Sequence, residues 1–296
     1  PAAILAAEDF PAKPIRLVVG YAAGGSADAS ARHLADWVSK KIGQPVLIEN
    51  KGGAAGSIAA ASVAGAPADG YTLLYATSDL VMYPALHKST NYDAVKDFAP
   101  ITALQTRALV LVTHPSLGVK SVRELIALAK AQRGKLTYAS AGPGSATHLG
   151  TELLKYAAGI EVLHVPYRSA GQATTALLSG EAQILLTNMA SVLPHLKSGR
   201  IKALGVSSAK RSPLAPEVPT IAEAGVSGFE YMTWYGMLVP TGTPTLIVER
   251  IQADTAKIIQ APPVRIRFSA QGLDVYGNSP PEFQAYLNAE LAKWDR

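Results

Sequence analysis

A short apolar strand, a glycine-rich turn and a helix start follow one another near the beginning of the chain. Residues 15–19 read IRLVV, residues 20–28 read GYAAGGSAD, and apolar residues then recur at helical spacing up to Ile42. Glycine lets the backbone approach a ligand closely, and Ser26 or Asp28 can cap the helix while other N–H groups point outward. Free N–H donors at a helix start attract anions. An ordinary βα turn has the same pattern, so the unit predicts an α/β fold and a candidate anion site.

The same strand, turn and helix order recurs along the chain. Strands are predicted at 45–49, 71–76 and 136–140, and those at 45–49 and 136–140 are followed by a glycine turn and a helical pattern. The segment 141–148, AGPGSATH, repeats the glycine turn and helix start of the first unit. This alternation predicts doubly wound, mostly parallel sheets, in which ligands bind beyond the carboxyl ends of the strands.

Length and composition predict two domains. The 296 residues are 48% apolar and only 17% charged, which allows a substantial core and excludes a disordered chain. An apolar run at 109–112 and a long predicted strand at 231–239 mark the places where the chain would pass between domains. We expect lobe 1 to comprise residues 10–109 and 236–296, and lobe 2 to comprise residues 110–235, with a ligand cleft between them.

Charge and residue usage exclude several classes of function. The formal net charge is +5, but it is spread along the chain without a Lys or Arg block, so we expect no nucleic-acid partner. There is no cysteine, and the six histidines lack metal-ligand spacing, so we expect no metal and no cofactor. The apolar, small-residue segment that ends near Ala7 is similar to the tail of a signal peptide and predicts export.

Eight motifs in this order resemble the Bug family, the periplasmic solute receptors of tripartite tricarboxylate transporters (TctC-like proteins). The resemblance extends over nearly the whole chain, from Phe10 to Trp294. The motifs are KPIRLVV at 13–19, GG at 24–25 with Asp28 and Ala31-Arg32, IGQPV at 42–46, DGYTLL at 69–74, VKDFAP at 95–100, GS at 144–145 with His148-Leu149, HVPY at 164–167 and VPTIAEAG at 218–225.

The resemblance implies a two-lobed type II periplasmic binding fold, a Venus flytrap in which two crossover strands act as a hinge. It implies a periplasmic receptor, without catalytic residues, that captures a small carboxylate by lobe closure. Membrane subunits of a secondary transporter would be its partners, and we expect a monomer.

The expected ligand-binding residues come from both lobes. They are Tyr21, Ala23, Gly24, Gly25, Ser26, Asp28, Ser78, Ser140, Ala141, Gly144, Ser145, Thr147, His148, Tyr167, Arg168, Ser169, Thr187 and Trp234. For four of them another role is open: a helix cap for Asp28, a position behind the site for His148, an ion pair with a carboxylate at a solvated edge for Arg168, and packing for Trp234.

Two departures from the family pattern bear on the ligand. The prolines that usually surround the aromatic residue before the two glycines are absent around Tyr21, which predicts a more pliable wall. Thr187 stands where many relatives have aspartate, a natural partner for a ligand ammonium. We therefore expect a dicarboxylate without an amino group, such as an aromatic or long diacid stacked on Tyr21 or Trp234; an amino-acid-type carboxylate receptor is the alternative.

Two other classes of protein remain to be compared with the structure. A serine hydrolase would use Ser145 or Ser26 with His148, yet neither serine lies in a nucleophile elbow and no aspartate is positioned to orient the histidine. The effector domain of a transcription regulator shares the architecture but needs a DNA-binding segment upstream, whereas about a dozen residues precede the first strand.

Overall fold

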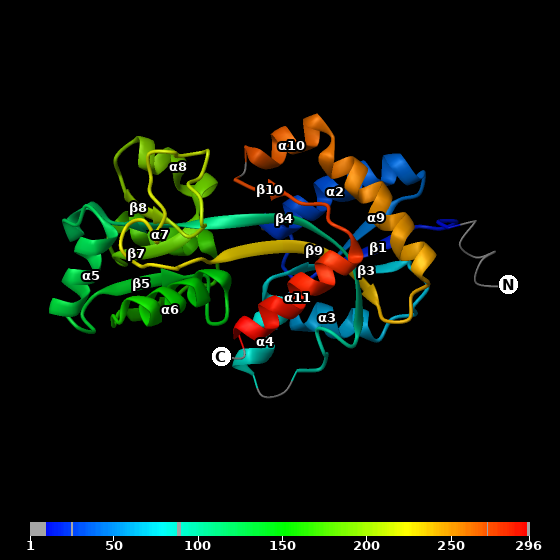
Figure 1. Cartoon of the computed structure of the whole chain (residues 1–296), viewed down its shortest axis with the longest axis horizontal. Coiled ribbons are helices and arrows are strands. Elements are labelled where there is room, and N and C mark those ends of the chain that lie inside the picture. Colours follow the sequence, from blue (N-terminus) through cyan, green and yellow to red (C-terminus); the bar gives the residue numbers. More distant parts are fainter. Residues whose placement is uncertain (1–9, 25, 88–89, 271, 295–296) are drawn as a thin grey trace. The chain divides into compact units, whose positions relative to one another are not determined.

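The computed structural model describes residues 10–24, 26–87, 90–270 and 272–294 (Figure 1). These residues form two compact units. The first holds the chain up to Thr106 together with Trp234–Arg267 and the part from Asp274 onward; the second holds Arg107–Thr233 and Phe268–Leu273. The expected boundaries, at 109/110 and 235/236, fall a few residues later, and residues 268–273 lie in the second unit rather than the first.

The sheet of the first unit is parallel at one side and antiparallel at the other. Strand β1 (Ile15–Val19) lies between β2 (Val46–Asn50) and β3 (Thr72–Thr77), and all three run in the same direction. Strand β9 (Met232–Pro240) pairs antiparallel with β3 and is followed by β4 (Phe98–Thr113), whose first half pairs with the short β10 (Asp274–Val275). The predicted mixed α/β architecture is confirmed in this unit.

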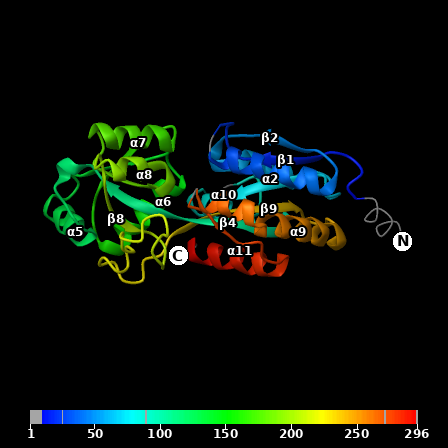
Figure 2. The same ribbon diagram turned by 90° about the horizontal axis from the view of Figure 1, so that it is seen from above.

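Helices cover both faces of that sheet, as its doubly wound order requires (Figures 1 and 2). The helices are α2 (Ser26–Ile42) and α9 (Thr245–Gln260), which pack on each other; α3 (Ser57–Ala64), α4 (Asp79–Leu86) and α11 (Pro280–Trp294); α10 (Pro262–Ser269); and the 3₁₀ turn η1 (Ala54–Gly56). Helices α4 and α10 have no counterpart among the elements expected from sequence. Thr243, two residues before α9, donates its hydroxyl to the Pro240 carbonyl at 2.7 Å and so does not cap this helix, although the pair Thr243-Pro244 has the sequence of a helix start.

The second unit has the same arrangement of strands. Strand β5 (Thr137–Ser140) lies between β6 (Leu163–Pro166) and β7 (Ile184–Asn188), all parallel. The second half of β4 pairs antiparallel with β7 and with β8 (Lys202–Val206). Because Leu109 pairs with Asn188 and Thr113 with Ile184, β4 ends beside the amino ends of β5 to β7.

Helix α6 (Ala146–Ala158) covers one face of the second sheet, while α7 (Ala170–Ser179) and α8 (Met189–Lys197) cover the other (Figure 1). The chain leaves β4 through the 3₁₀ turn η2 (Pro115–Leu117) into α5 (Val122–Ala131). Small buried residues of α7, including Ala173 and Ala176, let it pack closely on the apolar strands. The core therefore holds the carboxyl ends of β5 to β7 fixed relative to the helix starts that follow them.

Four helices begin with the same hydrogen bond. The residue two positions before the helix donates its backbone N–H to the side chain of the third helical residue. The pairs are Gly24 with Asp28 in α2 (2.9 Å), Lys120 with Glu124 in α5 (2.8 Å), Gly144 with His148 in α6 (3.2 Å) and Arg168 with Gln172 in α7 (3.1 Å). This bond is a variant of the capping box and fixes each turn to its own helix.

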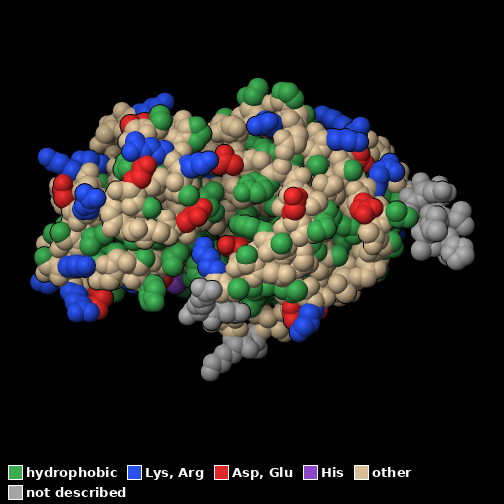
Figure 3. Space-filling view, in the orientation of Figure 1, with side chains coloured by type: hydrophobic (Ala, Val, Ile, Leu, Met, Phe, Trp, Pro, Cys, Tyr) green, Lys and Arg blue, Asp and Glu red, His purple; other side chains and the backbone are tan. Residues whose placement is uncertain are grey.

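Charged side chains of both signs share the surface. On the face drawn in Figure 3, Lys and Arg lie among Asp and Glu. No helix within the described ranges is both long enough and apolar enough to cross a membrane.

Close packing of α6 generates a stability prediction. A Cβ atom on Gly150 would stand 2.6 Å from both Leu186 Cδ2 and Tyr231 Cε1. Gly150→Ala should therefore lower the free energy of unfolding by about 1–3 kcal/mol, although alanine favours helices. The control is Gly171→Ala in α7, where the nearest atom is Ser169 Oγ at 3.8 Å. Urea denaturation should show little change for this control, and equal stability of the two variants would contradict the packing argument.

Candidate functional site

The first glycine turn is held by Asp28. This buried carboxylate accepts the N–H of Gly24 at 2.9 Å, Asn50 Nδ2 at 2.9 Å and Arg32 Nε at 3.0 Å. Asn50, at the end of β2, also donates to the Tyr21 carbonyl at 2.9 Å. Of the two roles considered for Asp28, the structure shows the cap: its carboxylate accepts the Gly24 N–H at the start of α2, and the bonds from Arg32 and Asn50 anchor the turn further.

The hydrogen bonds also set the charge of Asp28. Burial by itself would raise its pKa, but the bonds from Arg32, Gly24 and Asn50 outweigh burial and lower the pKa below its usual value. The Asp28 carboxylate is therefore ionised at neutral pH, and Arg32 balances its charge.

A buried tyrosine and carboxylic acid pair lies beside this turn. The Tyr21 hydroxyl donates to Asp79 at the start of α4 and lies 3.5 Å from Thr77 Oγ1. Burial raises the pKa of Asp79 to about 6, against the effect of the bonds from Tyr21 and Thr77, and its Oδ1 has no partner among the described residues. Burial, followed by the charge of Asp79, raises the pKa of Tyr21 well above its ordinary value. Tyr21 is thus a neutral donor with a fixed position.

A second turn lies against the first. A Cβ on Gly20 would stand 2.7 Å from the Cα of Gly56, so the two backbones touch where no side chain fits. Ala54 and Ala55 before it have φ of 47° and 51°, a left-handed conformation that costs about 1 kcal/mol or more per residue. A small hollow in this unit is lined by Gly20, Tyr21, Ala55, Gly56, Ala60, Leu74, Tyr75, Ala76, Thr77 and Leu80.

The other expected residues of the first unit differ in exposure. Ala23 and Gly24 are exposed, whereas Ser78 is buried and donates its N–H to the Trp234 carbonyl at 3.2 Å. The Trp234 side chain is 1% exposed and packs edge-on against Phe283, with Tyr286 nearby. The ring of Trp234 therefore has no free face in this structure on which a ligand could stack. Gly25, the side chain of Ser26 and the segment ending near Ala7 lie outside the described residues.

The second glycine turn, between β5 and α6, is held by its own hydroxyl groups. Ala141 N–H donates to Thr147 Oγ1 at 2.8 Å, and Gly142 N–H donates to Ser140 Oγ at 3.0 Å. Ser145 Oγ donates to the Gly142 carbonyl at 2.6 Å and accepts the His148 N–H at 3.3 Å.

Two backbone N–H donors at the start of α6 take no part in the hydrogen bonds that hold the turn. The N–H groups of Ala146 and Thr147, the first two helical residues, have no partner within the described ranges. These free N–H groups lie at the positive end of the helix dipole. A carboxylate at the start of α6 would be favoured by both the donors and the dipole.

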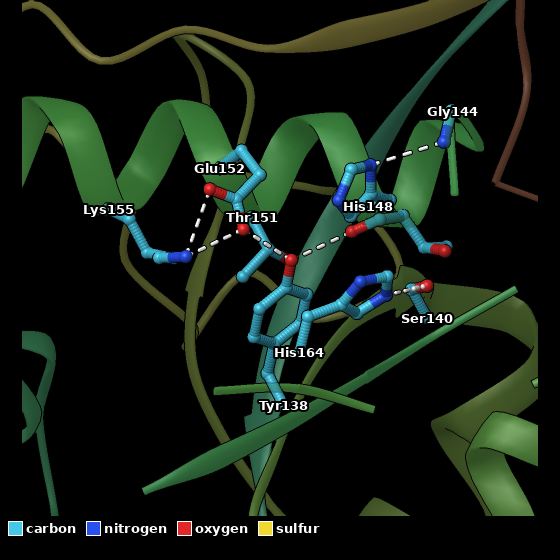
Figure 4. A network of polar contacts seen from close by, with 9 residues as sticks. Tyr138, Ser140, Gly144, His148, Thr151, Glu152, Lys155 and His164 are labelled. Atoms are coloured by element: carbon cyan, nitrogen blue, oxygen red, sulfur yellow. Dashed lines mark hydrogen bonds and ion pairs between the residues drawn. The ribbon is translucent and has the colours of Figure 1, made fainter. Parts of the chain in front are cut away.

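Two imidazoles lie behind this turn (Figure 4). The His148 and His164 ring centres are 4.3 Å apart, and His164 stacks on Tyr138 at 4.8 Å. His148 Nδ1 accepts the Gly144 N–H at 3.2 Å, and His164 Nε2 lies 2.6 Å from Ser140 Oγ. Tyr138 in turn donates to Glu152. The structure thus places His148 behind the turn, holding it from within the unit.

The turn after β6 comes next to the glycine turn. The Tyr167 N–H donates to the Ser140 carbonyl at 3.0 Å, and a Cβ on Gly142 would be 3.3 Å from the Tyr167 carbonyl. Arg168 and Ser169 are exposed, and Ser169 caps α7 by accepting the Gln172 N–H at 3.3 Å. The structure therefore brings Tyr167, Arg168 and Ser169 to the same edge of the sheet as the other residues expected in this lobe. Those residues are Ser140, Ala141, Gly144, Ser145, Thr147 and His148.

Thr187 lies one residue before the end of β7 and is fully buried. Its hydroxyl has no partner among the described residues. At this position, where the family resemblance implies an aspartate in many relatives, this chain therefore has a neutral hydroxyl without a hydrogen-bond partner among the described residues.

The serine and histidine contacts do not form a hydrolase site. The pair in contact is Ser140 with His164, and Ser140 is fully buried beneath the turn. Ser145 is bonded to backbone atoms and Thr147, and His148 Nδ1 is occupied by the Gly144 N–H. In the part of the chain that the structure describes, no three His, Asp or Glu residues are grouped to hold a metal ion.

Sequence reasoning missed several residues that hold these turns. Asn50 ends β2 and Asp79 comes shortly after β3, so their place at the carboxyl edge of a parallel sheet was the available signal. His164 was noticed in the motif HVPY and as a histidine without metal spacing, but its stacking on His148 requires the folded sheet.

Comparisons with known proteins agree over nearly the whole chain. A sequence profile described as the tripartite tricarboxylate transporter family receptor matches residues 30–296. BugT of Bordetella pertussis is 35% identical over 295 residues, which cover 99% of this chain and 90% of BugT.

Two solved structures add ligands to the comparison. Rpa4515 of R. palustris, with adipate, has a TM-score of 0.89 at 35% identity and covers 97% of this chain and 96% of its own. MatC from Rhodopseudomonas palustris, with bound malate, has a TM-score of 0.84 at 30% identity, with coverages of 97% and 99%. Periplasmic binding proteins are among these matches, which confirms the expected resemblance and the two-lobed fold.

Removing the anchor of the first turn should be costly. Asp28→Ala should lower the free energy of unfolding by about 2 kcal/mol, because the Gly24 N–H and Arg32 lose their charged partner. Since its pKa is lowered on folding, this contribution is present above the ordinary pKa of an aspartate and is lost as pH falls through the folded value. Denaturant titration at several pH values measures it. Asp36→Ala, at an exposed position of the same helix, is the control, and an equal loss there would contradict the anchoring role.

Replacing Asp79 should stabilise the folded protein, whereas replacing Asp28 should destabilise it. Its pKa is raised to about 6 by burial, so ionising it above that pH costs folding free energy. Asp79→Asn should therefore raise the free energy of unfolding by about 3 kcal/mol at neutral pH. The gain should shrink as pH falls from about 6 to below 4. Thermal melts across this range test it, and a gain that does not depend on pH would refute a buried, ionised Asp79.

Proposed function

We propose a function for this chain from the family to which it belongs, the tripartite tricarboxylate transporter receptors. The chain is a solute-binding receptor of the periplasm that captures an organic dicarboxylate and delivers it to the membrane subunits of a secondary transporter. It acts as a monomer, its signal peptide ends near Ala7, and it makes or breaks no bond in its ligand.

The pair of free N–H donors at the start of α6 is the observation that carries this proposal. Ala146 and Thr147 offer these donors at the carboxyl edge of a parallel sheet, where α/β proteins bind ligands. The Gly24 turn of the first unit supports the proposal because it has the same design, a glycine backbone held rigidly by a side chain of the following helix.

The energetics favour one carboxylate on each turn. A hydrogen bond to a charged group contributes about 1.5–3 kcal/mol, so two N–H donors contribute roughly 3–6 kcal/mol. Association itself costs about as much, so one turn alone binds weakly. Two turns that hold the two ends of one diacid reach the roughly 8 kcal/mol of a micromolar receptor.

Lobe closure couples this binding to transport. Strands β4 and β9 each continue from one unit into the other and are the hinge of the proposed movement. Because both turns hold the ligand only in the closed form, the ligand selects that form and the membrane subunits recognise it.

The ligand we propose is a dicarboxylate without an amino group. Thr187 has a neutral hydroxyl rather than a carboxylate that could pair with a ligand ammonium, and this feature supports a diacid over an amino acid. Relatives solved with adipate and malate support a diacid. Burial of Trp234 leaves Tyr21 as the aromatic side chain for an extended or aromatic diacid. An amino-acid-type receptor is the second candidate.

A thermal-shift panel tests the ligand class. Adipate and terephthalate should raise the melting temperature, citrate less so, and glutamate not at all, because a ligand that binds only the folded state stabilises it. Isothermal titration then gives the affinity. Acetate at equal ionic strength is the control for a general anion effect. A shift with glutamate alone would replace the proposal by the amino-acid alternative.

A further inference from the structure

The cap of α6 differs chemically from those of the other helices that begin in the same way. The acceptor for the loop N–H is a carboxylate in α2 and α5, an amide in α7, and an imidazole in α6. Glutamate and glutamine are the usual residues at this third helical position. A histidine there accepts the N–H through Nδ1 without carrying negative charge.

Within the second unit, position in the sheet separates the charged cap of α5 from the neutral caps of α6 and α7. The chain leaves β4 at the amino ends of β5 to β7, on its way to the Glu124 cap of α5. The caps of α6 and α7 follow the carboxyl ends of β5 and β6, at the edge where the free N–H donors of Ala146 and Thr147 lie. At this edge both acceptors, His148 and Gln172, are neutral. In the first unit the Asp28 carboxylate is balanced by Arg32 at 3.0 Å.

We infer that His148 is a positioning residue that also determines charge specificity, because it fixes the Gly144 turn with a neutral acceptor and so keeps a carboxylate away from the anion-binding start of α6. A glutamate at position 148 would satisfy the same N–H but would repel an anionic ligand at the helix start. The inference rests on the proposed binding of a dicarboxylate.

The surroundings of His148 keep its imidazole neutral. Burial lowers the pKa of His148, Lys155 lowers it further, and Glu152 opposes both. The His164 ring at 4.3 Å disfavours a second positive charge, and its own pKa is lowered by burial and by His148. The remaining titratable group of this stack, Tyr138, is bonded to Glu152, which is paired with Lys155 at 2.7 Å (Figure 4).

The hydrogen bond from the Gly144 N–H to His148 is sensitive to pH, because its acceptor is the ring nitrogen Nδ1. Protonated His148 carries hydrogen on both ring nitrogens, so it can no longer accept the Gly144 N–H. A cationic imidazole also attracts a carboxylate, so affinity against pH would mix two opposing effects. The hydrogen bond between Gly144 and His148 is therefore measured in ligand-free protein as the pH is varied. The effect of charge at position 148 on ligand affinity is measured at a single pH.

Three variants separate the acceptor from its charge. His148→Gln keeps a neutral acceptor, as Gln172 does in α7, and His148→Glu keeps an acceptor but adds a negative charge. At about pH 7.5, calorimetric titration with adipate should show His148→Gln within about threefold of the wild type and His148→Glu weaker by roughly tenfold or more. Glu124→Gln removes a charge from the same helical position in α5 and should leave the affinity unchanged. Circular dichroism confirms that each variant folds.

Amide chemical shifts test the bond directly. In ligand-free wild-type protein, the Gly144 amide resonance should move with a midpoint below the ordinary pKa of histidine, together with the ring resonances of His148. In His148→Gln this movement should disappear. Replacement of the exposed cap, Gln172→Glu, should leave the Gly144 titration in place.

The possible outcomes distinguish this inference from the proposed function. Wild-type protein that binds none of the four acids of the thermal-shift panel would overturn the proposed function. Wild-type protein that binds adipate while His148→Glu binds it equally well would overturn the inference alone. A Gly144 amide that does not follow the ionisation of His148 would remove the positioning role.

Discussion

The structure depends on how the backbone leaves each strand of a parallel sheet. At the carboxyl edge the chain loses its ladder partners before its helix begins, and each N–H in the turn needs an acceptor. In both units a side chain of the third helical residue supplies it, Asp28 for Gly24 and His148 for Gly144. This bond makes turn and helix one rigid piece, so the donors that remain free keep a fixed direction. The anion site that we propose relies on that rigidity and does not need a dedicated basic side chain.

Much of this was predictable because it is local. The strand β1, the helix α2, the Gly144 turn and the end of α6 at Gly159 follow from apolar spacing, glycine and capping residues that are neighbours in the sequence. What could not be predicted depends on pairs brought together by the fold. Tyr21 and Asp79 are 58 residues apart, and the stacking of His148 on His164 requires β5 and β6 to pair. The full length of β4 was also missed, because its first half, FAPITALQT at 98–106, contains polar residues where a continuous apolar run was sought.

The predicted site residues divide into those that can meet a ligand and those that shape the turn. Ser140, Ser145 and Thr147 were expected as ligand contacts, and the structure commits their hydroxyls to backbone atoms of the turn. Residue type alone cannot separate these roles, because a hydroxyl serves equally well in either. Residue type is equally uninformative for the aromatic residue Trp234. Its position in a strand predicted neither the depth of its burial nor its contact with α11. Family membership adds the kind of ligand, which geometry within one unit does not supply.

The contact between Gly20 and Gly56 limits how such a receptor can diversify. A side chain at Gly20 would collide with the backbone of Gly56, and Gly56 has a positive φ of 86° that residues with a side chain rarely adopt. If this lobe holds a ligand as we propose, new ligand preferences would arise at Tyr21, Ala22 and Ala23, where side chains are partly or fully exposed. The two alanines leave room there that larger residues could fill. A rigid frame thus surrounds a short stretch that can vary freely, and duplicated copies of such a gene could change their cargo without rebuilding the lobe.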